Sequence, residues 1–199
     1  LYHEGPFKTW GKYEFNPTYF PTGKEGVKQA VKKTKAAGLH FGVHTLTNFI
    51  NTNDPYVSPV PDERLVKTGI SKLLLSITAT SQEIMVASPE YFNDEKNNTL
   101  HTVHIGSELI RYRAVSTTAP FTLMDCQRGA FNTRPAAHDR GSEVAKLLDH
   151  PYEVFFPSIA MQNEIAKNLA LLCNETGIDH LDFDGHEGGL ASGQGDYGI

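Results

Sequence analysis

The sequence predicts an α/β fold into which a small antiparallel β module is inserted. Strand-like and helix-like segments alternate over residues 1–45 and again over 158–184. Between residues 67 and 149 short alternating segments are instead separated by glycine and proline, which is typical of antiparallel strands. Structureless loops of that length are rare. We therefore interpret 67–149 as an inserted domain, and 1–66 with 150–199 as the domain that surrounds it.

The surrounding domain is predicted to contain three parallel strands and two helices. Thr22 and Glu25 have the spacing of a capping box, which favours a helix start, and Gly38 and Gly177 are typical helix ends. Three strands leave two open edges and are too few to close a barrel. We infer a piece of a larger fold. The expected elements are strands at 1–5, 39–45 and 178–184, and helices at about 22–37 and 158–176.

The inserted domain is predicted to be all β. Its apolar residues alternate with polar ones in short runs, and Gly106, Pro120, Gly129 and Gly141 separate these runs. The expected strands lie at 73–79, 83–87, 100–105, 108–115, 121–126 and 143–148.

Composition excludes some classes of function. The 199 residues have a formal net charge of −5 with both signs interspersed, so we predict no nucleic-acid partner and no membrane partner. No apolar run approaches the roughly 20 residues of a membrane span. Cys126 and Cys173 form no ligand or redox motif. Sequons at Asn97 and Asn174 are compatible with a secreted or periplasmic location, which we expect.

The strand expected at 178–184 carries the strongest chemical signal. Asp182 and Asp184 are two residues apart, so their side chains share one face of a strand, about 6–7 Å apart along it. Gly185 then begins a glycine-rich loop, and catalytic groups in α/β folds lie where strands end. The alternative is an acidic turn in which Asp184 caps the loop.

Two further segments carry a family resemblance. Asn16-Pro17-Thr18-Tyr19-Phe20-Pro21-Thr22-Gly23 and Gly38-Leu39-His40-Phe41-Gly42-Val43-His44-Thr45 resemble the second-to-third strand region of α-galactosidase-like (β/α)8 glycoside hydrolases. The resemblance covers about residues 1–50 and 156–188. It implies a partial (β/α)8 TIM barrel of about three βα units, whose remainder comes from the same parent chain or another subunit. It also implies a carbohydrate as substrate partner and no cofactor.

In that family the fourth strand ends in an aspartate nucleophile, and Asp184 takes this position. The family's usual lysine is Asp182 here, and the β module interrupts the third unit, so we interpret the chain as a polysaccharide-active relative. Retaining hydrolysis needs two carboxyl groups about 5–5.5 Å apart. Asp182 is expected to orient a substrate hydroxyl, or to be a hydrogen-bonded interior acid. Glu187 is the local candidate for the acid/base, and a chain without that group is expected to be nearly inactive.

Other polar and aromatic groups are expected at the same strand ends. Imidazole and carboxylate groups bind sugar hydroxyls, and an aromatic face packs on a sugar ring. The alternatives are a core histidine at position 44 and a loop anchor at position 10. The candidate substrate-binding residues are His3, Glu4, Trp10, His44 and His186.

Two other functions remain open. A metal-dependent hydrolase would use His3, Glu4, His44, Asp182, Asp184 and His186, although no HxH or HExxH spacing supports it. A non-catalytic carbohydrate-binding role would lie in the β module, whose segments 106–112 and 126–133 resemble a small β element of large extracellular proteins. There Arg128 is interpreted as a hydrogen-bonding strut of its turn.

Overall fold

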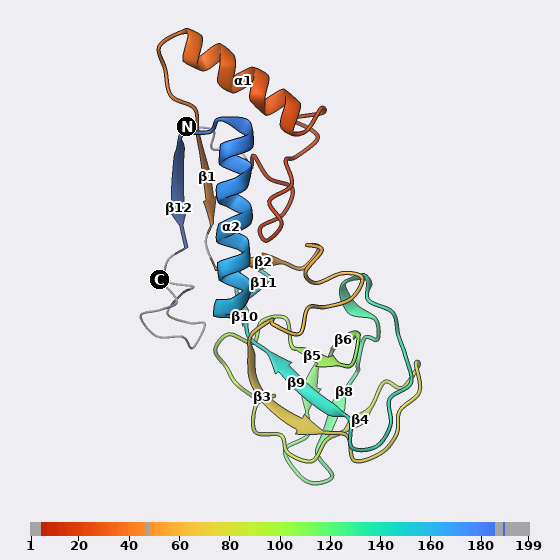
Figure 1. Ribbon diagram of the computed structural model, residues 1–199. Helices are drawn as coiled ribbons and strands as arrows, with labels where there is room; N and C mark the ends of the chain where they lie inside the picture. Colours follow the sequence, from red (N-terminus) through yellow and green to blue (C-terminus); the bar gives the residue numbers. More distant parts are fainter. Residues whose placement is uncertain (1–4, 47, 186–188, 190–199) are drawn as a thin grey trace. The chain divides into compact units, whose positions relative to one another are not determined.

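The computed structural model describes residues 5–46, 48–185 and 189. These residues form two compact units, drawn in Figure 1. Unit 1 comprises residues 1–50 and 157–199, and unit 2 comprises residues 51–156. The domain boundaries predicted from the sequence, at 66/67 and 149/150, differ from these.

Unit 1 is built from two helices and a pair of parallel strands. The strands β1 and β12 lie far apart in the sequence but side by side in the fold, with His44 directly opposite Asp182. The bounds are α1 Lys24–Ala36, β1 Gly42–Leu46, α2 Ile159–Thr176 and β12 His180–Asp184, and β2 Ile50–Asn51 follows at the boundary between the units.

The two helices end as their sequences predict, but α1 begins differently. Ser158 caps α2 by accepting a hydrogen bond from the Met161 amide at 3.4 Å, and Gly177 ends it in the left-handed region at φ 79°. The predicted capping box at the start of α1 is wrong. Gly23 occupies the N-cap position at φ 57°, and α1 has no side-chain cap.

The core of unit 1 lies between the helices and one face of the strand pair. Val27 and Val31 of α1 pack with Leu169 and Leu172 of α2, and Val43 of β1 joins them. Phe7, Tyr13, Phe15 and Phe20 from the first loop extend this cluster through ring contacts, with Phe7 and Tyr13 edge to face at 5.0 Å. The apolar stripes of both helices therefore cover a single side of the β1–β12 sheet.

The predicted partial (β/α)8 barrel is wrong. Among the strand pairs of the described residues whose direction is established, β1 with β12 is the parallel one, and these strands form no closed barrel. The other sheets with described pairings are small and antiparallel. The first strand expected, at 1–5, falls almost entirely outside the described residues. A repeated strand–helix pattern indicates elements, but it does not fix how many strands join one sheet.

Unit 2 is an antiparallel β structure with a core of its own. Its largest sheet has the order β3-β9-β5-β6, a second has the order β4-β8-β7, and β10 pairs with β11. The bounds are β3 Lys67–Lys72, β4 Ile84–Met85, β5 Thr102–Ile105, β6 Glu108–Arg111, β7 Ala114–Val115, β8 Thr122–Met124, β9 Glu143–Leu147, β10 Asp149–His150 and β11 Val154–Phe155, with a short 3-10 helix at Ala130–Asn132. The core includes Val86, Val103, Ile110, Leu123 and Val144.

The strands expected in this module are present in part. The strand expected at 73–79 is replaced by β3 at 67–72, followed by isolated bridges at Leu73 and Ile77. The strand expected at 108–115 is divided into β6, which pairs with β5, and β7, which pairs with β8, and Arg111 at the end of β6 also bridges to Gln127.

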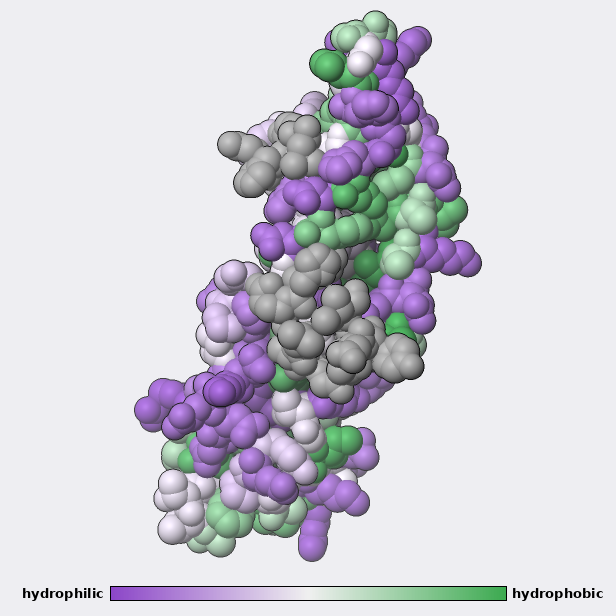
Figure 2. Space-filling model, turned by 90° about the vertical axis from the view of Figure 1, so that its left-hand side faces the viewer, coloured by the Kyte–Doolittle hydropathy of each residue, from purple (hydrophilic) through white to green (hydrophobic). Residues whose placement is uncertain are grey.

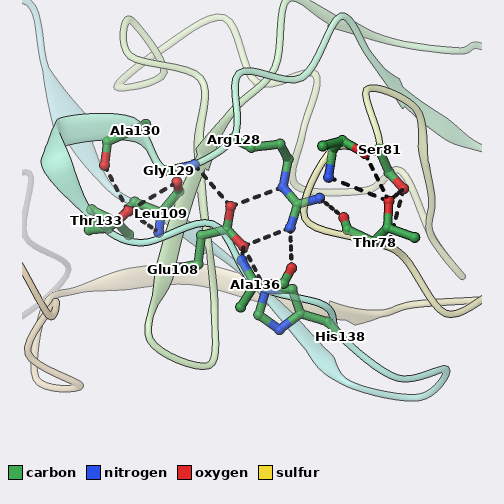
Figure 3. Close-up of polar contacts among 11 residues, drawn as sticks. Thr78, Ser81, Glu108, Leu109, Arg128, Gly129, Ala130, Thr133, Ala136 and His138 are labelled. Atoms are coloured by element: carbon green, nitrogen blue, oxygen red, sulfur yellow. Dashed lines mark hydrogen bonds and ion pairs between the residues drawn. The ribbon is translucent and has the colours of Figure 1, made fainter.

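A buried carboxylate joins the two sequence motifs of this module (Figure 3). Glu108 begins β6, and its side chain is fully buried. It accepts hydrogen bonds from Arg128 Nε at 2.9 Å and Nη2 at 2.7 Å, and from the Gly129 and Ala136 amides at 2.9 and 3.2 Å. His138 Nε2 donates a further bond at 2.7 Å. Five donors thus satisfy one carboxylate.

The Arg128 guanidinium has partners besides Glu108. It also donates to the carbonyl oxygens of Ala136, at 2.7 Å, and Thr78. On the other side of Glu108 from the guanidinium, the Thr133 hydroxyl accepts a bond from the Leu109 amide at 3.0 Å (Figure 3). These bonds tie three loops to β6, which is the strut role that we predicted for Arg128.

We expect Gly129→Ala to destabilise unit 2. Gly129 has φ 60°, and a Cβ there would lie 2.6 Å from Pro135 Cδ. The left-handed backbone costs an alanine about 1–2 kcal/mol, and the overlap adds to this. Urea denaturation followed by far-ultraviolet circular dichroism measures the loss. Gly141→Ala is the matched control, because Gly141 has φ 87° but a Cβ there would meet no atom within 4 Å. Equal losses in both variants would show that the overlap is unimportant.

A second buried charge pair lies at the end of β9. The Asp149 carboxylate accepts hydrogen bonds from the Thr99 and Leu100 amides at 2.6 and 3.1 Å, and Lys146 Nζ lies 3.6 Å away. Burial lowers the pKa of Lys146 and raises that of Asp149, while their mutual attraction opposes both shifts. The pair fixes the loop that precedes β5.

Among the residues that Figure 2 colours by hydropathy, hydrophilic side chains predominate on the face drawn, and hydrophobic ones gather in patches between them. In the described part of the chain, neither helix is long and apolar enough to cross a membrane.

Candidate functional site

The β1–β12 sheet has an apolar face and a polar face. Val43 and Leu181 point to the helices and belong to, or pack against, the core of unit 1. Alternation along each strand puts His44, Asp182 and Asp184 on the opposite face. Of these three residues, His44 and Asp182 are half-buried and Asp184 is exposed. The polar groups therefore gather on the side of the sheet that the helices do not cover.

His44 and Asp182 form a cross-strand pair. His44 Nδ1 lies 2.9 Å from Asp182 Oδ2, and the side chains are 22% and 47% exposed. An ionised carboxylate only accepts, so the imidazole Nδ1–H donates. This bond sets the orientation of the ring and holds the carboxylate in one position. The structure thus brings together two of the predicted site residues.

Asp184 lies at the carboxyl end of β12, opposite Leu46 in the register. Its Oδ1 accepts a hydrogen bond from the Gly185 amide at 2.7 Å, which is the contact expected of a loop cap. Gly185 has φ 80°, and a Cβ there would lie 2.7 Å from a ring carbon of Phe49. The backbone therefore turns away immediately after Asp184 and leaves its side chain at the strand end.

The other predicted site residues are placed apart from these or are not described. Trp10 packs against the core of unit 1, as the loop-anchor interpretation expects. His3, Glu4, His186 and Glu187 lie outside the described residues. Within residues 5–46, 48–185 and 189, no three His, Cys, Asp or Glu side chains are grouped to hold a metal ion.

A polar cluster at the opposite end of the sheet was missed in the sequence. Asp179 accepts a hydrogen bond from the Phe41 amide at 3.0 Å, lies 3.0 Å from His40 Nδ1, and pairs with Lys35 at 3.4 Å. The hydrogen bond from His40 holds the pKa of Asp179 below its ordinary value. The cluster aligns the starts of β1 and β12. Its only sequence signal is the placement of His40 and Asp179 just before two strands.

A polar cavity in unit 2 was also missed. It has a volume of about 320 Å³ and includes His104, His138 and Glu63 in its lining. The signal in the sequence was a histidine between two apolar residues, Val103-His104-Ile105. A lone histidine in an apolar strand is too common to identify a site, and its neighbours come from distant segments.

Comparisons of this chain with models of protein families, with curated proteins and with solved structures gave no match.

Proposed function

We propose that the chain is the catalytic part of a glycoside hydrolase that acts on a carbohydrate or polysaccharide with retention of configuration. The observation that supports this proposal most is the polar face of the β1–β12 sheet. It presents an exposed carboxylate, Asp184, at the end of a parallel strand, next to the hydrogen-bonded pair of His44 and Asp182. A carboxylate that is exposed at the carboxyl end of a parallel strand can reach the anomeric carbon of a bound sugar and act as its nucleophile.

In the proposed reaction Asp184 attacks the anomeric carbon, the acid/base gives a proton to the leaving oxygen as its bond to that carbon breaks, and a covalent glycosyl–enzyme ester forms. Water then hydrolyses that ester and releases the sugar. Asp182 accepts a hydrogen bond from a substrate hydroxyl while His44 holds its carboxylate in place. The acid/base has to be a second carboxyl group about 5–5.5 Å from the nucleophile. Glu187, three residues further along the chain, is the local candidate for this role.

Covalent trapping tests the proposal directly. A fluorosugar with a good leaving group forms the glycosyl ester but slows its hydrolysis, because fluorine destabilises the oxocarbenium-like transition state. We expect intact-mass spectrometry of the treated chain to show one added glycosyl group, and peptide mapping to place it on Asp184. Adduct on another carboxylate would contradict the assignment, and no adduct with any sugar of an α- and β-linked panel would contradict the retaining mechanism. A chain treated with the free fluorosugar, which lacks the leaving group, is the control.

A further inference from the structure

The cavity in unit 2 contains a buried imidazole nitrogen without a partner. His104 lies in the centre of β5, and its side chain is only 2% exposed. Its Nε2 forms no hydrogen bond, and the carboxylate that faces it, Glu63 Oε1, is 3.6 Å away, beyond hydrogen-bonding distance. Leaving a polar atom buried and unsatisfied is unfavourable, and each such atom in a folded protein requires an explanation. A ligand that supplies the missing partner is one explanation.

The Glu63 side chain, which faces this nitrogen, is held in place by an exposed ion pair. Glu63 has a side chain that is 70% exposed, and its other carboxylate oxygen accepts from Lys67 Nζ at 2.9 Å. Exposed ion pairs of this kind contribute little to stability. The Glu63 side chain can therefore swing into solvent, which opens the cavity to His104 Nε2.

The lining indicates the chemistry of the ligand. With Glu63 displaced, Glu143 supplies acceptors, Lys67 supplies donors and Ser142 supplies both, beside the apolar Ala145. Two carboxylates disfavour an anion, and the lysine disfavours a cation. Burial lowers the pKa of His104, because a buried site disfavours the charged imidazolium. A neutral molecule with several hydroxyl groups matches this mixture.

The walls of the cavity are fixed by the network described above. His138 lines the cavity and is held by Glu108 at 2.7 Å, and Gly106 leaves space beside its ring. A Cβ on Gly106 would lie 3.6 Å from His138 Cε1. The volume of about 320 Å³ is at the small end of the range for ligand sites. It suits one small molecule.

We propose that this cavity binds a neutral polyhydroxylated small molecule, such as a single sugar unit, with one hydroxyl replacing Glu63 at His104 Nε2. This site lies in unit 2 and is independent of the catalytic function proposed for unit 1. It would give the chain a binding function even where Asp184 takes no part.

Nuclear magnetic resonance of the histidine Cε1–H groups tests the proposal in the whole chain. Glucose, galactose, mannose and inositol are titrated, with acetate and inorganic phosphate as anionic probes. We expect at least one sugar or polyol to shift the His104 and His138 signals in a saturable way. The absence of a shift with all four, or preferential binding of an anion, would overturn the proposal.

Two substitutions are expected to act in opposite directions. His104→Leu removes the partner of the hydroxyl and should weaken binding about threefold to tenfold, which is the value of one hydrogen bond. Glu63→Ala removes the competing side chain and should strengthen binding about twofold to fivefold. Glu95→Gln, at an exposed position outside the cavity lining, is the matched control and should change nothing.

The Glu63 variant keeps the test decisive if the His104 variant fails to fold, since Glu63 is exposed. Unchanged or weaker binding in Glu63→Ala would contradict the displacement of Glu63. Unchanged binding in a folded His104→Leu chain would contradict the role of the imidazole.

Discussion

Replacing Glu108 by glutamine is expected to destabilise unit 2 by about 3–5 kcal/mol, the usual cost of removing one partner from a buried ion pair. The glutamine amide nitrogen would face N–H donors where a carboxylate now accepts five hydrogen bonds. Arg128, whose side chain is 6% exposed, would keep a charge that no anion balances. Urea denaturation, followed by the near-ultraviolet circular dichroism of the tyrosines, measures the loss in the free energy of unfolding.

The chain carries a built-in control for this experiment. Its single tryptophan, Trp10, lies in unit 1, so tryptophan fluorescence reports that unit alone. We expect the fluorescence transition to stay in place while the transition of unit 2 moves to lower urea. Glu95→Gln is the matched substitution at an exposed position and should leave both transitions unchanged. Equal losses in the two glutamine variants would show that the network contributes nothing.

The same carboxylate should make unit 2 sensitive to acid. Burial would raise the pKa of Glu108, but the hydrogen bonds from Arg128, His138 and two backbone amides outweigh it, and the pKa falls below its ordinary value of 4.5. A lowered native pKa stabilises the fold fully above the unfolded value. That stability is lost as the pH falls through the native value. In Glu108→Gln this part of the acid dependence should disappear, which denaturation at a series of pH values between neutral and strongly acidic would show.

The helices were predictable because their signals are local. Ser158 and Gly177 act within one turn of α2, so the residues beside them suffice to place its ends. The start of α1 shows where this reasoning fails. Thr22 and Glu25 have the spacing of a capping box, but Gly23 adopts a positive φ and becomes the N-cap instead. The spacing of two side chains does not report the backbone conformation of the glycine between them.

The sheets were less predictable because strand pairing depends on distant contacts. His44 and Asp182 are directly opposite each other although 138 residues separate them. The period of two along β12 was enough to put Asp182 and Asp184 on one face. It could not show that only one other described strand pairs with β12, and so the barrel prediction was wrong.

The same limit applies to unit 2. The sequence singled out the segments around Glu108 and Arg128 and predicted a strut, but not that these two residues bind each other. Nor did it point to His104, because a cavity is a property of several strands and loops together. Its lining combines residues from Glu63 to Ala145. No pattern within a short window contains that information.

For the proposed hydrolase, Asp184→Gly is expected to reduce kcat/KM by at least about 10⁴-fold, because the group that forms the covalent intermediate is lost. The substrates are dinitrophenyl glycosides, whose leaving group needs no protonation, so the assay reports the nucleophile whether or not the acid/base is present. Release of dinitrophenolate, followed by absorbance, is the measurement. Asp179→Asn is the matched control, because Asp179 precedes the same strand at its other end and contacts His40 and Lys35 instead.

Added azide separates a lost nucleophile from a damaged fold. In Asp184→Gly the space left by the carboxylate admits an azide ion, whose nitrogen bonds to the anomeric carbon as the aryl oxygen leaves with its electron pair. The product is a glycosyl azide of inverted configuration, and its rate of formation should rise with azide concentration. Asp182→Asn keeps the nucleophile and should lose activity without azide rescue, because its part is to orient a hydroxyl. Rescue in both variants, or in neither, would contradict the assignment of Asp184 as nucleophile and Asp182 as the group that positions the substrate.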